Sequence, residues 1–192
     1  LGCTVVLVTH DLDEAALLSS HLCLIRRGRL VQAGPTQRVL ARPESAEAAR
    51  LLDYGNIFRA AVVSHDPAEG LTRLDWHGLP LVAPLDDRFR AGQPVDWTIS
   101  HAEVRPAAAT GGADPANTVH TTVRDLVVLG DDIHLRLAPE AVPLATLHMK
   151  CSRHACPLPL AAGDPLPVRL TPAAVVTMAA SDEDETPGRP HE

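Results

Sequence analysis

The sequence predicts a short α/β region followed by an all-β, barrel-like domain made of two similar halves. Strand-like and helix-like patterns alternate over residues 4–52, as they do in α/β folds. From residue 57 onward, apolar residues recur with period two between turn residues, and helical periodicity is almost absent. One segment of this second region also occurs twice. We therefore expect a boundary within residues 54–59.

The first region opens with an apolar, β-branched run at residues 4–8, which is typical of a strand buried on both faces. His10 follows at the carboxyl end of this strand, where open α/β sheets place residues that contact ligands. Asp11 can cap the next helix, and Glu14 stands at the capping-box position. Spacing alone leaves two interpretations of His10 open, an ordinary loop histidine or a functional one.

The rest of the first region is interpreted as scaffold. A hairpin is predicted to turn at Arg27-Gly28, between strands at residues 22–26 and 29–33. Helices are predicted at residues 12–19, 36–41 and 45–52.

The second region contains an internal repeat. Residues 91–104 (AGQPVDWTISHAEV) align without gaps to residues 162–175 (AGDPLPVRLTPAAV). Their shared period-two apolar positions predict a half-buried strand in each copy. Two β units are expected, over about residues 61–105 and 118–178. Neither unit has enough apolar residues for a stable sheet alone, so the two should pack on each other in one domain.

These patterns divide the chain into residues 1–56, 57–178 and 179–192. The last part is acidic and contains prolines, so we expect it to be disordered. Residues 106–116 are small and should form a surface loop between the two halves. A fainter echo relates residues 78–83 (GLPLVA) to residues 141–146 (AVPLAT), and predicts a second pair of equivalent strands.

Composition limits the functional classes. The net charge of −7 argues against a nucleic-acid-binding surface. No apolar run approaches the roughly 20 residues that are needed to cross a bilayer. The four cysteines suggest no disulfide framework, so we expect a reducing cytosol. Cys3 and Cys23 are predicted to be buried in strands as small apolar side chains.

The segment VVLVTHDLDEAALLSSHLCLIRRGRLVQAGPTQRVLARP resembles the end of the nucleotide-binding domain of ABC transporter ATPases. VTHD is similar to the family's switch-histidine loop, and LIRRGRLVQAG to its closing hairpin. In that family the histidine contacts the γ-phosphate of ATP and helps to arrange the attacking water. The resemblance therefore implies a catalytic role for His10 in a complete ATPase. Ser20 and His21 depart from the usual Asp-Arg, and GPT replaces GTP at residues 34–36.

Other motifs of the ATPase family are absent from these 192 residues. The sequence has no G-x-x-x-x-G-K-[ST] loop to hold phosphates, no signature motif and no acidic strand end to hold Mg²⁺. We therefore expect the first region to be the end of a P-loop NTPase sheet, in the C-terminal part of a longer protein. ATP and Mg²⁺ would bind to the full-length parent, and this chain alone should be inactive.

Residues 117–137 and 161–178 resemble the second half of the TOBE region, a β-barrel that follows the ATPase domain in importer ATPases for molybdate, sulfate and related oxyanions. In molybdate-type members this region can bind the transported oxyanion. The resemblance implies binding of molybdate, tungstate or sulfate by cationic and hydroxyl side chains. The corresponding residues here are Asn117, Thr118, Lys150, Ser152 and Arg153.

Alternatives remain for the turn that carries Lys150. It could be a solvated basic turn without a ligand. A zinc site would use the four soft ligands His148, Cys151, His154 and Cys156. Their spacing lacks the usual C-x₂-C pairs, so no metal is predicted. A regulatory disulfide between Cys151 and Cys156 is a further alternative.

Two functional hypotheses follow from these resemblances. In the first, the chain is the C-terminal portion of the ATP-binding subunit of an ABC importer, and its β domain serves regulation or dimerisation. Its partners would be permease membrane subunits and a second ATPase subunit in a homodimer. It would be cytoplasmic and peripheral on the inner face of the plasma membrane. In the second, it is a free-standing oxyanion-binding or sensing protein without ATPase activity. A transcription regulator is disfavoured because no helix-turn-helix is predicted.

Overall fold

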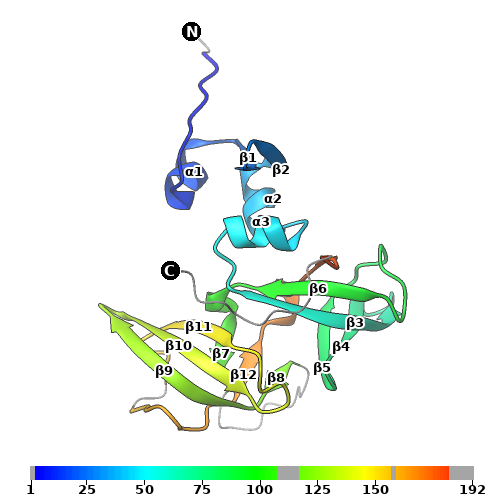
Figure 1. Cartoon of the computed structure of the whole chain (residues 1–192), viewed down its shortest axis with the longest axis vertical. Helices are drawn as coiled ribbons and strands as arrows, with labels where there is room; N and C mark the ends of the chain where they lie inside the picture. Colours follow the sequence, from blue (N-terminus) through cyan, green and yellow to red (C-terminus); the bar gives the residue numbers. More distant parts are fainter. Residues whose placement is uncertain (1–2, 108–116, 157–158, 182–192) are drawn as a thin grey trace.

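The computed structural model of the chain describes residues 3–107, 117–156 and 159–181. Figure 1 shows the N-terminal helices and hairpin at one end of the molecule and the β domain at the other. The first region consists of short helices and a hairpin: α1 (Leu12–Leu18), β1 (His21–Arg26), β2 (Arg29–Pro35), α2 (Thr36–Ala41) and α3 (Ala46–Leu51). These elements agree with the helices and the hairpin that the sequence predicts.

The helix caps explain where α1 and α3 begin. Oδ1 of Asp11 accepts the backbone N–H groups of Asp13 and Glu14 at 2.8 and 3.0 Å, and Ser45 caps α3 in the same way. The predicted capping box is wrong. The backbone N–H of Asp11 donates instead to Oγ1 of Thr9 at 3.0 Å, and the Glu14 carboxylate accepts the Thr9 hydroxyl at 2.8 Å.

The prediction of a buried strand at residues 4–8 is also wrong. These residues have no regular secondary structure, and the side chains of Val6 and Val8 are 86% and 92% exposed. A strand needs neighbours for its backbone N–H and C=O groups, and no strand of the described residues pairs with this run. Cys3 and Cys23 are exposed as well, contrary to prediction. In β1 it is Leu24 that faces inward, toward a small core with Val39.

The second region is almost entirely β-structure, with two 3₁₀ turns, η1 and η2. The elements are β3 (Asn56–Asp66), β4 (Leu71–Trp76), β5 (Leu79–Pro84), β6 (Pro94–Ile99), η1 (His101–Glu103), β7 (Val104–Pro106), β8 (Thr118–Val119), β9 (Thr121–Leu129), β10 (Asp132–Pro139), β11 (Leu147–Ser152), β12 (Val168–Leu170), η2 (Pro172–Ala174) and β13 (Val176–Ala179). They form sheets in the orders β13-β6-β3-β4-β5, β11-β10-β9 and β7-β12-β8. We call β3 to β6 the first half and β8 to β12 the second half.

The repeat forms the crossing point between the two halves. In each copy a strand leads into a 3₁₀ turn and then into another strand: β6-η1-β7 in the first copy and β12-η2-β13 in the second. After η1 the chain crosses over, so that β7 pairs with β12 of the second half. After η2 it crosses back, so that β13 pairs with β6 of the first half. The two copies are therefore equivalent, and each half ends in a strand of the other half's sheet.

Two details differ from the predicted strands. β6 is buried on both faces rather than one, and α3 packs beside it. The echo of residues 78–83 at residues 141–146 does not mark equivalent strands. Residues 140–144 form bends and a turn, and β11 begins only at Leu147.

One apolar core unites the two halves. It runs without interruption from first-half residues such as Leu74 to second-half residues such as Leu135. Phe58, Trp76 and Trp97 form an aromatic cluster within it, with ring centroids 4.7–5.1 Å apart. Such edge-to-face and tilted contacts stabilise more than the buried area alone. This shared core explains why neither half needs a complete core of its own.

Two predicted loop segments of the β domain, the linker between its halves and its C-terminal tail, reach the limits of the described residues. Most of the predicted linker 106–116 and of the predicted tail 179–192 lies outside them. Ala179 still belongs to β13, and Ser181 is held by Arg59 and Asp96 through hydrogen bonds of 2.6 and 2.8 Å. Within the described part of the chain, no helix has the length and apolar character that crossing a bilayer requires.

Candidate functional site

His10 occupies an exposed bend just before α1. Thr9 and Asp11 on either side of it are held by the hydrogen bonds that begin the helix. The imidazole is therefore presented to solvent from a fixed backbone. It is the single residue here to which the family resemblance assigns contact with nucleotide. One imidazole cannot bind a nucleotide polyphosphate and Mg²⁺, so these 192 residues do not fit ATP·Mg²⁺ by themselves.

The structure gives Asn117, one of the predicted oxyanion ligands, a structural position. The side chain is fully buried. Its Nδ2 donates to the carbonyl of Val82 at 2.7 Å, and its Oδ1 accepts the N–H of Val82 at 2.6 Å. The residue has a φ of 62°, a conformation that asparagine tolerates better than most residues. Asn117 therefore joins the start of β8 to β5 of the first half.

Asn56 occupies the equivalent position in the first half. It pairs with Ile99, as Asn117 pairs with Leu170, the counterpart of Ile99 in the repeat. The Asn56 side chain makes the same two hydrogen bonds to the other half. Its Nδ2 donates to the carbonyl of His148 at 2.8 Å, and its Oδ1 accepts the backbone N–H of His148 at 2.7 Å. This pair of asparagine clamps indicates that Asn117 contributes to holding the halves together.

Lys150, Ser152 and Arg153, on β11 and the turn after it, belong to a different segment from Asn117 and Thr118. Thr118 is half-buried in β8. Lys150 lies on the outer face of β11, where its Nζ is 2.8 Å from a carboxylate oxygen of Asp132. Ser152 ends this strand, and Arg153 begins an exposed turn. No hydrogen bond or ion pair among the described residues joins Thr118 to these three side chains.

The four soft ligands of the zinc alternative do not converge, and the described residues contain no cluster that could hold a metal ion. Cys156 is buried, and Cys151 packs against the same core. Burial, together with a hydrogen bond between the two thiols, raises the pKa of Cys151 to about 12. A thiol in this state is a poor nucleophile and a poor metal ligand at neutral pH.

His148 instead meets His101, a residue that the sequence did not single out. The two rings stack with centroids 5.5 Å apart, because η1 packs on β11. Burial lowers the pKa of both side chains; in His101 the neighbouring His148 adds to the effect. At the equivalent contact of the other half, η2 packs on β5 and Pro172 replaces His101. The repeat alignment could have revealed this difference, since it sets a histidine against a proline.

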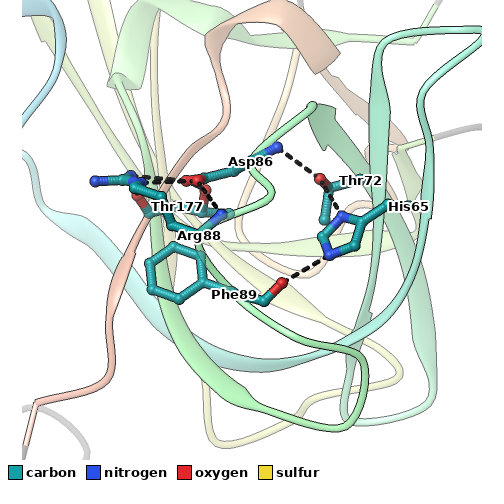
Figure 2. Close-up of polar contacts among 6 residues, drawn as sticks. All are labelled: His65, Thr72, Asp86, Arg88, Phe89 and Thr177. Carbon is teal, nitrogen blue, oxygen red and sulfur yellow. Dashed lines mark hydrogen bonds and ion pairs between the residues drawn. The ribbon is translucent and has the colours of Figure 1, made fainter.

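A second polar cluster holds the loop between β5 and β6 against β3 and β4 (Figure 2). His65 Nε2 lies 2.7 Å from the carbonyl of Phe89, which can only accept, so Nε2 carries the proton. Nδ1 is hydrogen-bonded to the Thr72 hydroxyl at 3.0 Å, and Thr72 accepts the N–H of Asp86 at 2.9 Å. Because these polar groups satisfy one another, we interpret this part of the cluster as a structural tie.

The same loop is fastened on its other side by a carboxylate (Figure 2). Asp86 accepts two hydrogen bonds of 2.7 Å from the Arg88 guanidinium and one of 2.6 Å from the Thr177 hydroxyl in β13. Burial alone would raise the pKa of Asp86, but these hydrogen bonds and the Arg88 charge outweigh it and hold the pKa below its ordinary value. The loop thereby ties the crossing strand β13 to the first half.

Comparison with known proteins shows which proteins this chain resembles. The model of the TOBE domain matches residues 99–178, which include both 3₁₀ turns and the second half. A ferric ion import ATP-binding protein of Streptomyces coelicolor is 29% identical over 187 residues, which cover 96% of this chain and 47% of that protein. A molybdate/tungstate import ATP-binding protein of Thermococcus kodakarensis is 37% identical over 103 residues, 52% of this chain and 29% of that protein.

A third relative and a solved structure extend the comparison. A spermidine/putrescine import ATP-binding protein of Methylococcus capsulatus is 32% identical over 114 residues, 58% of this chain and 29% of that protein. The chain thus spans less than half the length of these three relatives. The cytoplasmic molybdate-binding protein ModG superposes with a TM-score of 0.54 at 15% identity, over 66% of this chain and 97% of that one. This likeness concerns the fold of the β domain. Over the aligned residues the chain is similar to the ATP-binding subunits of ABC importers, and the TOBE-domain model matches its residues 99–178.

Proposed function

We propose that the chain is the C-terminal portion of an ABC importer's ATP-binding subunit, specific for molybdate or a related oxyanion. The observation that carries the importer assignment is the alignment of 96% of the chain with one import ATP-binding protein. An alignment of this length must include most of the first region as well as the TOBE region, which supports the assignment of both to one type of polypeptide. In the complete protein the β domain would regulate the ATPase or hold two subunits together.

The exposed apolar surface of the first region supports its assignment to the end of a P-loop NTPase sheet. Val5, Val6 and Val8 are 81–92% exposed, although their β-branched side chains favour a buried strand. Leu17 and Leu18 of α1 are 83% and 73% exposed. Groups of exposed apolar side chains of this kind are typical of an interface. We propose that the remainder of an ATPase sheet covers it and brings His10 to the nucleotide.

ATP and Mg²⁺ would be bound by parts of the ATPase outside these 192 residues. His10 would then act on a phosphate that other residues hold, which is why no hydrolytic step is assigned to this chain alone. Permease subunits and a second ATPase subunit are the proposed partners, and the inner face of the plasma membrane is the proposed location.

The oxyanion assignment is the finer part of the proposal. The relatives named above import ferric ions, polyamines or molybdate and tungstate, so family membership does not select among substrates. A hydroxyl and two cationic side chains at the end of β11, Ser152, Lys150 and Arg153, support an anion. In this proposal Asn117 is not a ligand, because its side chain is bonded to Val82.

Two measurements test the proposal separately. Calorimetric titration of the chain with molybdate, tungstate and sulfate should give heat for at least one oxyanion. The variants Lys150→Ala and Arg153→Ala should each weaken binding by about tenfold or more, and Arg90→Ala, in the β5–β6 loop, should not. Absence of heat in well-folded protein would remove the oxyanion assignment and leave a regulatory or dimerising domain.

The importer assignment is tested in a complete ATP-binding subunit that carries these 192 residues as its C-terminal portion. ATP turnover by that protein should fall severely on His10→Ala, without loss of thermal stability, because His10 is exposed. Unchanged turnover in the variant would overturn the role of His10. Measurable turnover by the purified 192-residue chain would overturn the inactive-fragment assignment.

A further inference from the structure

A cavity of about 640 Å³ opens between the β1–β2 hairpin and the start of α3. Its size lies within the range of small-molecule sites. Three arginines and one acidic residue contribute to the wall of the cavity, whose lining residues are Arg26, Arg27, Arg29, Leu30, Val31, Ser45 and Glu47. We call this the arginine pocket.

The hairpin places like charges opposite one another in the arginine pocket. Arg26 and Arg29 are direct cross-strand partners, an arrangement that destabilises a hairpin unless the charges are compensated. Arg27 lies between them in the turn, with a φ of 50°. Three guanidinium groups therefore come from four consecutive residues and line one cavity.

The protein compensates only part of this charge. Glu47 of α3 forms an ion pair with Arg26, at 3.4 Å. Within the described residues, Arg27 and Arg29 have no ion pair of their own. Arg26 is thus neutralised, and two positive charges remain at the pocket.

The segment that surrounds the arginine pocket is also positively charged. Residues 20–52 contain six arginines and two acidic residues, although the whole chain has a net charge of −7. Segregation of positive charge within an acidic protein concentrates anions at that surface. Arginine is the side chain best suited to phosphate, because its planar guanidinium donates two parallel hydrogen bonds.

We propose that the arginine pocket binds a phosphate-bearing anion through Arg27 and Arg29, with Arg26 held in place by Glu47. The ligand class is a phosphate ester or polyphosphate with at least two negative charges. It is either a soluble metabolite or the headgroup of an anionic phospholipid, since both present the same group. This site is distinct from the β-domain turn discussed above and does not depend on the proposed oxyanion site.

The first test uses inorganic pyrophosphate as the probe, with the 192-residue chain at constant ionic strength. Calorimetry should detect saturable binding to the wild type. Arg27→Gln and Arg29→Gln should each weaken it by about tenfold or more, because each removes a charge-assisted pair of hydrogen bonds. Arg90→Gln, an exposed arginine of the β5–β6 loop, is the matched control and should change affinity by less than about twofold.

Glu47→Gln gives a test of opposite sign. This substitution removes the carboxylate that competes with the anion for Arg26. Pyrophosphate should therefore bind about threefold more tightly or better. A nonspecific effect of net charge would instead make every Arg→Gln variant equally weak. Far-ultraviolet circular dichroism and thermal melting of each variant show that the fold is retained.

A second arm separates the two sources of phosphate. Sedimentation with phosphatidylcholine vesicles, with and without phosphatidic acid, measures binding to headgroups. Binding only to vesicles that contain phosphatidic acid, lost in Arg27→Gln and Arg29→Gln, assigns the pocket to lipid; binding of pyrophosphate alone assigns it to a soluble ligand. Absence of both, or equal losses in Arg90→Gln, would overturn the proposal.

Discussion

The backbone N–H of Gly55 donates a hydrogen bond to Nε2 of His101 at 3.1 Å. An N–H group can only donate, so Nε2 must be unprotonated, and His101 is neutral in this contact. Gly55 lies between α3 and β3, and His101 lies in η1. The bond therefore joins the end of the first region to the crossing point of the β domain, and its formation depends on pH.

The first prediction is a loss of stability on acidification. Burial, with the neighbouring His148, lowers the pKa of His101 from its ordinary value of 6.5, with smaller effects of the same sign from His134 and Lys150 and an opposing effect from Asp53. The unfolded state then binds more protons than the folded state as the pH falls below 6.5. The free energy of unfolding should therefore be highest above pH 6.5 and decrease below it.

Urea denaturation monitored by the fluorescence of the two buried tryptophans tests this prediction from about pH 8 to about pH 5. His101→Gln keeps an acceptor without a titrating ring, so it should flatten part of the pH dependence. Adding His148→Gln should flatten it further, because the pKa of His148 is lowered by burial too. His120→Gln, at an exposed position, is the control. An undiminished slope in the double variant would contradict the prediction.

The second prediction concerns the close approach of Gly55 to the His101 ring. A Cβ at residue 55 would lie 2.6 Å from Nε2 of His101, which is closer than atoms pack. Gly55→Ala should therefore destabilise the protein by about 1–3 kcal/mol. In a His101→Ala background the same substitution should cost much less. Thermal unfolding of the four proteins forms a double-mutant cycle, and additive effects would show that the steric contact is unimportant.

The third prediction compares the asparagine clamps. Asn56→Ala should leave backbone groups of His148 without partners, at a cost of about 2–4 kcal/mol. Asn117→Ala should cost about 1 kcal/mol more, because alanine is disfavoured at a positive φ. Asn117→Gly should avoid this additional cost of about 1 kcal/mol but should still lose the two side-chain hydrogen bonds. Equilibrium urea unfolding measures each value, and a cost below about 1 kcal/mol for both alanine variants would contradict the clamp.

The fourth prediction concerns the Asp86 carboxylate. Because its pKa is held below 3.8, its stabilisation should be complete above that pH and be lost as the pH falls below it. Thr177→Val removes a hydrogen bond to a charged group and should cost about 1.5–3 kcal/mol near neutral pH. The cost should shrink at a pH below 3.8 that is low enough to protonate Asp86.

Thr122→Val is the matched control for that prediction, since no described carboxylate contacts the Thr122 hydroxyl. Chemical denaturation at both pH values gives the comparison. An equal cost of Thr177→Val at both values would mean that its hydroxyl does not act through the charge of Asp86.

Local signals predicted the first region well where the chain determines its own geometry. Asp11 and Ser45 are strong caps, and Arg27-Gly28 adopts the positive φ values of a tight hairpin turn, so the helices and the hairpin lie where predicted. The run at residues 4–8 failed because a strand needs partners that periodicity cannot supply. The predicted burial of Cys3 and Cys23 was wrong for the same reason, because it assumed a core that the described residues do not form.

The candidate sites were harder to predict than the strands. The repeat correctly equates Ile99 with Leu170, but no pattern shows that the asparagine paired with each of them bonds across to the other half. Asn117 looks like a polar ligand in sequence and is a buried clamp in space. His101 and the arginine pocket depend on contacts between segments that are distant in sequence, which spacing does not reveal.

The exchange of β7 and β13 has a consequence for how such a domain can be assembled. Each half lacks one sheet-completing strand and offers one to its counterpart. A polypeptide containing a single half would have one unpaired sheet edge and one strand able to pair with such an edge. Two identical copies could therefore complete each other's sheets by exchanging these strands. Here one chain supplies both copies. Covalent connection makes the encounter intramolecular, and it frees the two copies to diverge, as the stacked histidines on one side and the proline on the other already illustrate.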